Sequence, residues 1–124
     1  MTRKILDVGQ CNADHSRITD LLNKHFDIEI YRAHSHDEAI QMALDHAMDL
    51  ILINRLLDSD STPGMDVLNS LKTNPSTSNT PVMLVSNYQD AQDAAIQSGA
   101  VIGFGKAKLD TEETKLALSR HLTD

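Results

Sequence analysis

Short apolar runs alternate along the chain with segments whose apolar residues recur at helical spacing. The runs, which are typical of strands, cover residues 5–8, 28–31, 50–53, 82–85 and 101–104. The segments between them carry apolar residues three or four positions apart, as on one face of a helix: Ile18, Leu21, Leu22, Phe26; Ala39, Ile40, Ala43, Leu44, Ala47; Val67, Leu68, Leu71; Ala91, Ala94, Ala95; and Ala117, Leu118, Leu122. The pattern predicts five strand and helix pairs, with the first helix beginning at Asp14.

Capping and breaking residues mark several helix boundaries. Ser35 followed by Glu38 has the spacing of a capping box, and Asp110 followed by Glu113 repeats it. Both pairs therefore predict helix N-termini. Gly99 directly follows a helical pattern and predicts that the helix ends there.

Strict alternation of strands and helices is typical of a parallel sheet covered on both faces by right-handed crossover helices. The continuous apolar run at residues 50–53 indicates a central strand that is buried on both faces. With 124 residues the chain has room for one domain, residues 1–124. We therefore predict a single doubly wound α/β domain, in which ligands meet the carboxyl ends of the strands.

Composition narrows the possible functions. The formal net charge of -7 and the lack of a basic cluster argue against nucleic-acid binding. No apolar stretch is long enough to span a bilayer and no secretory leader is evident, so neither membrane insertion nor secretion is expected. Cys11 is the only cysteine, which excludes an internal disulfide and favours a reducing, cytoplasmic location. Its thiol is expected to be inert, with a reactive thiol as the alternative.

The blocks DLILIN, PGMDVL, TPVMLVS and SGAVIGFGK resemble those of response-regulator receiver domains, the CheY-like superfamily, and the resemblance spans essentially the whole chain. It implies a flavodoxin-like (βα)5 fold with strand order 2-1-3-4-5. In that family the third strand ends in an aspartate that accepts a phosphoryl group. An acidic pair after the first strand binds Mg²⁺, and a Thr or Ser and a Lys end the fourth and fifth strands.

Three positions depart from this pattern. The phosphoacceptor position is Asn54, whose amide lacks the nucleophilic oxygen that an acyl phosphate requires. The acidic pair maps to Gly9 and Gln10, which offer no carboxylate to a hard divalent cation. The resemblance therefore implies a degenerate pseudo-receiver with no metal and no catalytic residue.

Other positions keep part of the family pattern. Ser86 matches the hydroxyl residue and Lys106 matches the lysine, although Ala107 follows it where the family usually has proline. The aromatic switch position is filled by Gly103, and Phe104 is expected to belong to the core. The phosphoacceptor and the aromatic switch residue are thus absent, while the hydroxyl residue and the lysine that respond to phosphorylation in the family remain.

Two side chains leave alternatives open. Lys106 is expected to be partly exposed, either solvated or donating to the amide oxygen of Asn54, because burying an unpaired ammonium is costly. Asp7 interrupts the first strand. Either that strand is shorter than drawn or its carboxylate points toward the open end of the sheet, and a displaced acidic ligand is a third reading.

We therefore predict a phosphorylation-independent signalling module that has no enzymatic activity and no cofactor. Its expected partner is another signalling protein or an output domain of the same protein, contacted through the face of the fourth helix, fifth strand and fifth helix, which is also the candidate face for a homodimer. The candidate exposed contacts are Tyr88, Gln89, Gln92, Gln97, Lys108 and Lys115. One alternative is a conventional phosphorelay receiver that is phosphorylated at another aspartate, such as Asp58. Small-molecule binding is a third class, which the lack of a glycine-rich phosphate loop disfavours.

Overall fold

A five-stranded parallel sheet forms the middle layer of the protein in the computed structural model, which describes residues 1–123. Its strands are β1 (Arg3–Val8), β2 (Ile28–Ala33), β3 (Leu50–Asn54), β4 (Val82–Val85) and β5 (Val101–Phe104). All neighbouring pairs are parallel and their order is β2-β1-β3-β4-β5. The predicted doubly wound fold and its strand order are confirmed.

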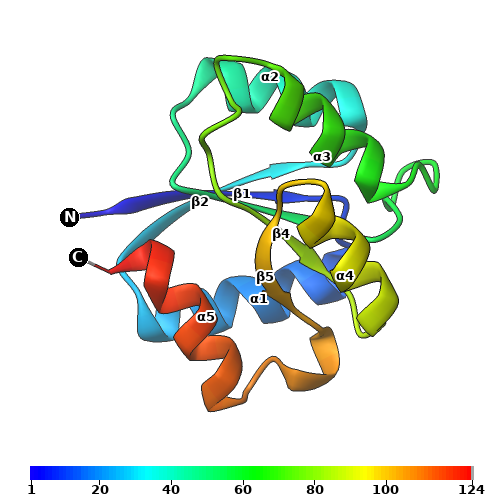
Figure 1. The fold of residues 1–124 in the computed structure, drawn as a ribbon. Helices are drawn as coiled ribbons and strands as arrows, with labels where there is room; N and C mark the ends of the chain where they lie inside the picture. Colours follow the sequence, from blue (N-terminus) through cyan, green and yellow to red (C-terminus); the bar gives the residue numbers. More distant parts are fainter. Residues whose placement is uncertain (124) are drawn as a thin grey trace.

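Helices cover both faces of this sheet (Figure 1). They are α1 (Asn12–His25), α2 (His36–Asp45), α3 (Gly64–Thr73), α4 (Gln89–Gln97) and α5 (Glu112–Leu122), with a short 3₁₀ helix, η1 (Lys106–Lys108), after β5. In the view of Figure 1, α2 and α3 lie above the sheet and α1 and α5 below it. None of the helices within residues 1–123 has the length and apolarity needed to cross a membrane.

The central strand β3 explains why there are two hydrophobic cores. Leu50 and Leu52 pack into the core beneath α1 and α5, whereas Ile51 and Ile53 pack into the core shared with α2, α3 and α4. All four side chains are at most 1% exposed. Because neighbouring side chains of a strand point to opposite faces, a strand covered on both sides must be apolar at every position.

The two predicted capping boxes have different outcomes. Ser35 is the N-cap of α2, where its hydroxyl oxygen accepts a hydrogen bond from the Glu38 N–H at 3.2 Å, as predicted. The prediction that Asp110 caps α5 is wrong. Thr111 is the N-cap, with an extended backbone, and its hydroxyl oxygen accepts from the Thr114 N–H at 3.3 Å. Two adjacent residues could each cap, and the backbone conformation selects the later one.

The ends of two other helices test the remaining boundary predictions. Helix α4 stops before Gly99, whose φ of 105° lies in the left-handed region, so the predicted end is confirmed. Helix α1 begins at Asn12, two residues before the predicted start at Asp14, because Cys11 already has the extended backbone of an N-cap. This earlier start brings the first turn of α1 up to the carboxyl edge of the sheet.

Candidate functional site

Five residues singled out from the sequence lie at the carboxyl edge of the sheet. Asn54 ends β3, Gly9 and Gln10 directly follow β1, Ser86 directly follows β4, and Lys106 begins η1 just beyond β5. Parallel strands present their carboxyl ends at one edge, which is why these sequence-distant positions share one side of the molecule. Their individual contacts decide what this edge can do.

The amide of Asn54 is held by backbone carbonyl groups. Its Nδ2 donates to the carbonyl oxygen of Leu56 at 2.7 Å and to that of Gly9 at 3.3 Å. A carboxylate at this position would turn an acceptor oxygen toward two other acceptors, since an ionised carboxyl has no hydrogen to donate. The local backbone is therefore arranged for an amide donor.

The position of Gly9 has no room for an acidic side chain. Its φ is 75°, and an added Cβ would lie 2.5 Å from Leu57 Cδ2 and 2.9 Å from Leu57 Cα. The Gly9 carbonyl oxygen also accepts the backbone N–H of Asp58 at 3.0 Å, so the β3–α3 loop packs directly against the end of β1. Both the left-handed conformation and this close approach require glycine.

The Gln10 side chain is buried, with the residue only 1% exposed. Neither polar atom of its amide has a hydrogen-bond partner within residues 1–123. In the same range no group of three or more histidine, cysteine, aspartate or glutamate side chains is placed to hold a metal ion. The edge thus presents amides where a magnesium site would need carboxylates.

Lys106 forms an ion pair that sequence reasoning missed. Its Nζ lies 2.7 Å from Asp14 Oδ2 in the first turn of α1, and both side chains are about one quarter exposed. The expected partial exposure is therefore found, but the lysine pairs with Asp14, which was neither of the predicted alternatives. The hydrogen bond from Lys106 lowers the pKa of Asp14 below its ordinary value, against a smaller opposing effect of burial. No sequence motif links these residues, which lie 92 positions apart.

The hydroxyl of Ser86 also has a fixed contact. Ser86 is 8% exposed, and its Oγ accepts the backbone N–H of Tyr88 at 3.1 Å. The Tyr88 ring lies outside, where the guanidinium carbon of Arg55 sits 5.0 Å from the ring centroid. This cation–π contact joins the loops that follow β3 and β4.

Gly103 occupies an irregular point of β5. The pairing of β4 with β5 shifts register between Met83 and Val85, and an added Cβ at Gly103 would lie 2.3 Å from the Leu84 carbonyl oxygen. A side chain at this position would collide with backbone. Phe104, the next residue, is 5% exposed and belongs to the core as predicted.

Gln92 corrects a prediction of exposure. Its residue is half-buried, and its Nε2 lies 2.9 Å from the carbonyl oxygen of Leu84, 3.1 Å from that of Ser86 and 3.3 Å from that of Phe104. This amide ties α4 to the ends of β4 and β5. The other five predicted surface contacts are all exposed: Tyr88, Gln89, Gln97, Lys108 and Lys115.

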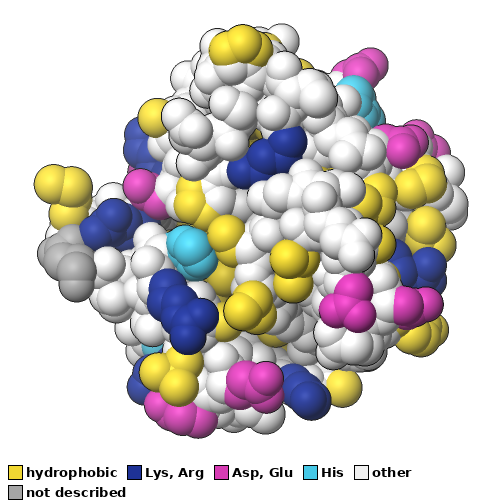
Figure 2. All heavy atoms as spheres, viewed as in Figure 1, with side chains coloured by type: hydrophobic (Ala, Val, Ile, Leu, Met, Phe, Trp, Pro, Cys, Tyr) yellow, Lys and Arg dark blue, Asp and Glu magenta, His cyan; other side chains and the backbone are white. Residues whose placement is uncertain are grey.

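A cavity of about 370 Å³ lies beside Gln92, between α4, β5 and α5. Ile102 and Leu116, which line it, are 59% and 56% exposed. Figure 2 shows hydrophobic side chains gathered over this region, at the centre of the view, with charged side chains around them. Charged Lys108, Glu113 and Arg120 also line the cavity. Such an apolar patch with a polar rim is typical of a protein contact surface.

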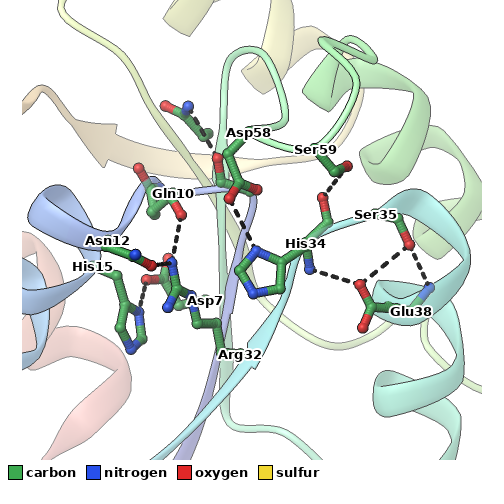
Figure 3. Close-up of polar contacts among 12 residues, drawn as sticks. Asp7, Gln10, Asn12, His15, Arg32, His34, Ser35, Glu38, Asp58 and Ser59 are labelled. Carbon is green, nitrogen blue, oxygen red and sulfur yellow. Dashed lines mark hydrogen bonds and ion pairs between the residues drawn. The ribbon is translucent and has the colours of Figure 1, made fainter.

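Asp7 lies inside β1 and is fully buried, facing the same side of the sheet as Ile5. The reading of a shortened strand is wrong, because β1 continues to Val8. The carboxylate points toward the first turns of α1, where the imidazole of His15 covers it at 2.6 Å (Figure 3). Burial raises the pKa of Asp7, and His15 and Arg32 oppose this effect. The signal in the sequence was a histidine in the first turns of the following helix.

The chain matches no protein-family model, and a search of curated proteins finds no match. Solved structures do match. A protein described as a response regulator from Chloroflexus aurantiacus J-10-fl aligns with 19% identity over 98% of both chains, with a TM-score of 0.85. The chemotaxis protein CheY4 of Vibrio cholerae aligns with 16% identity over 99% of this chain and 100% of that one, with a TM-score of 0.76.

The receiver domain of NtrX from Brucella abortus aligns with 24% identity over 95% of this chain and 97% of that domain, with a TM-score of 0.80. A longer NtrX structure aligns at 22% identity and a TM-score of 0.83 over 98% of this chain, which spans 28% of its length. These alignments cover 95% or more of this chain with TM-scores of 0.76 to 0.85. This chain has the fold of a response-regulator receiver domain.

Proposed function

We propose that this protein is a phosphorylation-independent signalling module of the receiver type, a pseudo-receiver that acts by binding another protein. The observation that carries this proposal is the Asn54 amide, which donates to two backbone carbonyl oxygens where the family has its phosphoacceptor. The lone pair of an amide nitrogen is delocalised into its carbonyl group and the side chain carries no negative charge, so Asn54 is a poor nucleophile toward phosphorus.

The contacts of the retained response groups support a single static state. Lys106 is paired with Asp14, the Ser86 hydroxyl accepts the Tyr88 N–H, and Gly103 leaves no ring to rotate. A switch needs groups that form different contacts in two states. Here each candidate group is either absent or already satisfied.

The face of α4, β5 and α5 is the proposed binding surface. Ile102 and Leu116 provide exposed apolar area beside a cavity, and Lys108 and Arg120 lie at its border. The partner is another signalling protein or an output domain joined to this chain, as in NtrX, where the aligned part is 28% of a longer chain. A homodimer through the same face is a second mode of use. We propose no catalytic activity, cofactor or direct contact with nucleic acid.

Intact-mass measurement tests the proposal. The protein is incubated with acetyl phosphate and Mg²⁺, and the expected spectrum shows no mass increase. A receiver domain known to be phosphorylated under these conditions serves as the positive control. An increase by one phosphoryl group that disappears at alkaline pH would overturn the proposal, since this lability is typical of an acyl phosphate.

A conventional receiver phosphorylated at Asp58 is the second candidate. One observation favours it: the backbone N–H of Asp58 donates to Gly9, so this aspartate lies beside the same strand end as Asn54. Its Oδ2 is hydrogen-bonded to His34 Nδ1 at 2.9 Å. If a phosphoryl group is detected, the variant Asp58→Asn tests whether it is attached to Asp58. Loss of the mass increase in that variant assigns it to Asp58.

A further inference from the structure

A buried polar cluster surrounds Asp7 at the base of the β1–α1 loop (Figure 3). Asp7 and Arg32 are directly paired positions of the neighbouring strands β1 and β2, and His15 reaches the cluster from α1. Within residues 1–123, Asp7 Oδ1, Arg32 Nε and both amide atoms of Gln10 have no hydrogen-bond partner, although all of them are buried. Buried polar atoms without partners are rare and costly, so such a group needs an explanation.

His15 connects this cluster to solvent. The ionised Asp7 carboxylate can only accept, so the hydrogen on His15 Nδ1 lies in the 2.6 Å contact with Asp7 Oδ2. The other ring nitrogen, Nε2, lies 3.5 Å from Thr19 Oγ1, and the His15 side chain is 19% exposed. The His15 side chain is thus partly open to solvent, and imidazole is the side chain that ordinarily changes charge near neutral pH.

Arg32 connects the cluster to the loop. One guanidinium nitrogen, an Nη, donates to the Gln10 carbonyl oxygen at 3.0 Å and to Asn12 Oδ1 at 2.9 Å. The Nε–H of Arg32 has no hydrogen-bond partner within residues 1–123, and neither has Oδ1 of Asp7, which is paired with Arg32 across β1 and β2.

We propose that the Asp7–His15 pair makes the β1–α1 loop responsive to protons through Arg32. When Nε2 takes a proton from solvent, the imidazolium balances the buried carboxylate and Arg32 stays on the loop. When that proton returns to solvent, the pair carries one net negative charge and draws the Arg32 Nε–H to Asp7 Oδ1. The Gln10 carbonyl and Asn12 side chain then lose their shared donor. The Gly9 carbonyl, which accepts from Asn54, lies next in the chain.

Other charged groups near the loop could also respond to pH, and their effects must be distinguished from that of the Asp7–His15 pair. Asp14, next to His15 in sequence, is engaged by Lys106 of η1. On the far side of Gly9, His34 Nδ1 lies 2.9 Å from Asp58 Oδ2. Asp7 is paired on β3 with Leu52, which is apolar. His34 is therefore the competing source of a pH response in this loop.

A titration followed by ¹H–¹⁵N NMR tests the proposal between about pH 5 and 8, the range in which histidines ordinarily titrate. The backbone amides of Gln10 and Asn12 and the Nε–H of Arg32 are expected to shift with the midpoint of the His15 ring signals. Signals that do not move, or that follow the His34 midpoint, would overturn the proposal.

Two variants separate the histidines. His15→Gln keeps a side-chain donor for Asp7 but cannot titrate, so the loop shift should disappear. His34→Gln is the matched control and should leave the shift and its midpoint unchanged. Persistence of the shift in a folded His15→Gln protein contradicts the proposal. If this variant fails to fold, the midpoints of the unmodified protein decide the question alone. Phosphorylation is read by mass, so the two proposals fail independently.

Discussion

Lys106 Nζ and Asp14 Oδ2 lie 2.7 Å apart and join the start of η1 to the first turn of α1. The lysine that follows β5 thus has a carboxylate partner although Asn54 offers it none. The partner comes from a helix 92 residues earlier in the chain. The ion pair therefore connects η1 to α1 at the carboxyl edge of the sheet.

Removing this carboxylate should have a small and pH-dependent effect. Because both side chains are partly exposed, Asp14→Asn is expected to lower the free energy of unfolding at pH 7 by about 0–1 kcal/mol. The pKa of Asp14 is lowered in the folded protein, so its contribution is present above the ordinary value of 3.8 and is lost as pH falls below it. Urea unfolding at several pH values measures this effect. Asp20→Asn, at an exposed position of α1, is the control, and the same dependence on pH in both variants would contradict the prediction.

Restoring a carboxylate at position 54 should destabilise the protein. In Asn54→Asp the ionised side chain faces the carbonyl oxygens of Leu56 and Gly9, and we expect a loss of about 1–3 kcal/mol at pH 7. The loss should shrink at acid pH, because a protonated carboxyl can donate. Thermal unfolding monitored by circular dichroism measures both values. Asn69→Asp, at an exposed position of α3, should change stability little.

No phosphorylation is expected from Asn54→Asp alone, since Gly9 and Gln10 still provide no carboxylate for Mg²⁺. Intact mass after incubation with acetyl phosphate tests this part of the prediction. A stable, phosphorylated variant would show that the pocket tolerates and uses an acid.

The amide of Gln92 should contribute to stability far more than a neighbouring surface glutamine. Gln92→Ala removes a donor to the carbonyl oxygens at the ends of β4 and β5, and we expect a loss of about 1–3 kcal/mol. Gln97→Ala, at an exposed position of the same helix, should stay within about 0.5 kcal/mol of the unmodified protein. Chemical unfolding of both variants measures the difference, and similar values would contradict the role given to Gln92.

The buried carboxyl of Asp7 should make stability fall as pH rises. Its pKa is raised in the folded protein, mainly by burial, so the folded state binds more protons than the unfolded state. The contribution of Asp7 to stability is therefore greatest below the ordinary carboxyl value of 3.8 and decreases as pH rises through the folded pKa. Asp7→Asn, whose amide oxygen still accepts from His15, should lack this decrease.

The difference between the unfolding free energies of the unmodified protein and Asp7→Asn, measured across acid and neutral pH, isolates the effect of Asp7. Asp110→Asn, at an exposed carboxyl, is the control and should retain the decrease. A difference that is constant with pH would show that Asp7 titrates alike in both states.

Local sequence patterns determined much of the fold. The unbroken apolar run of β3 required helices on both faces, Ser35 with Glu38 marked the start of α2, and Gly99 marked the end of α4. Each of these signals depends on residues a few positions apart, within one strand or one helical turn. Alternation of the elements then restricted the topology to a doubly wound sheet. The likeness to receiver domains placed Asn54, Gly9 and Gln10 at the strand ends, because the matching blocks of sequence are themselves short and local.

Contacts between distant elements were decided only by the tertiary structure. The partners of Lys106, Asp7 and Gln92 depend on how each helix is rotated about its axis and where its first turn begins. Periodicity leaves both of these uncertain by a residue or two. An error of that size redirects a long polar side chain by several ångströms, whereas it leaves an apolar residue inside the same core. For this reason the sequence predicted the layers and the strand ends correctly but not the polar pairs that connect them.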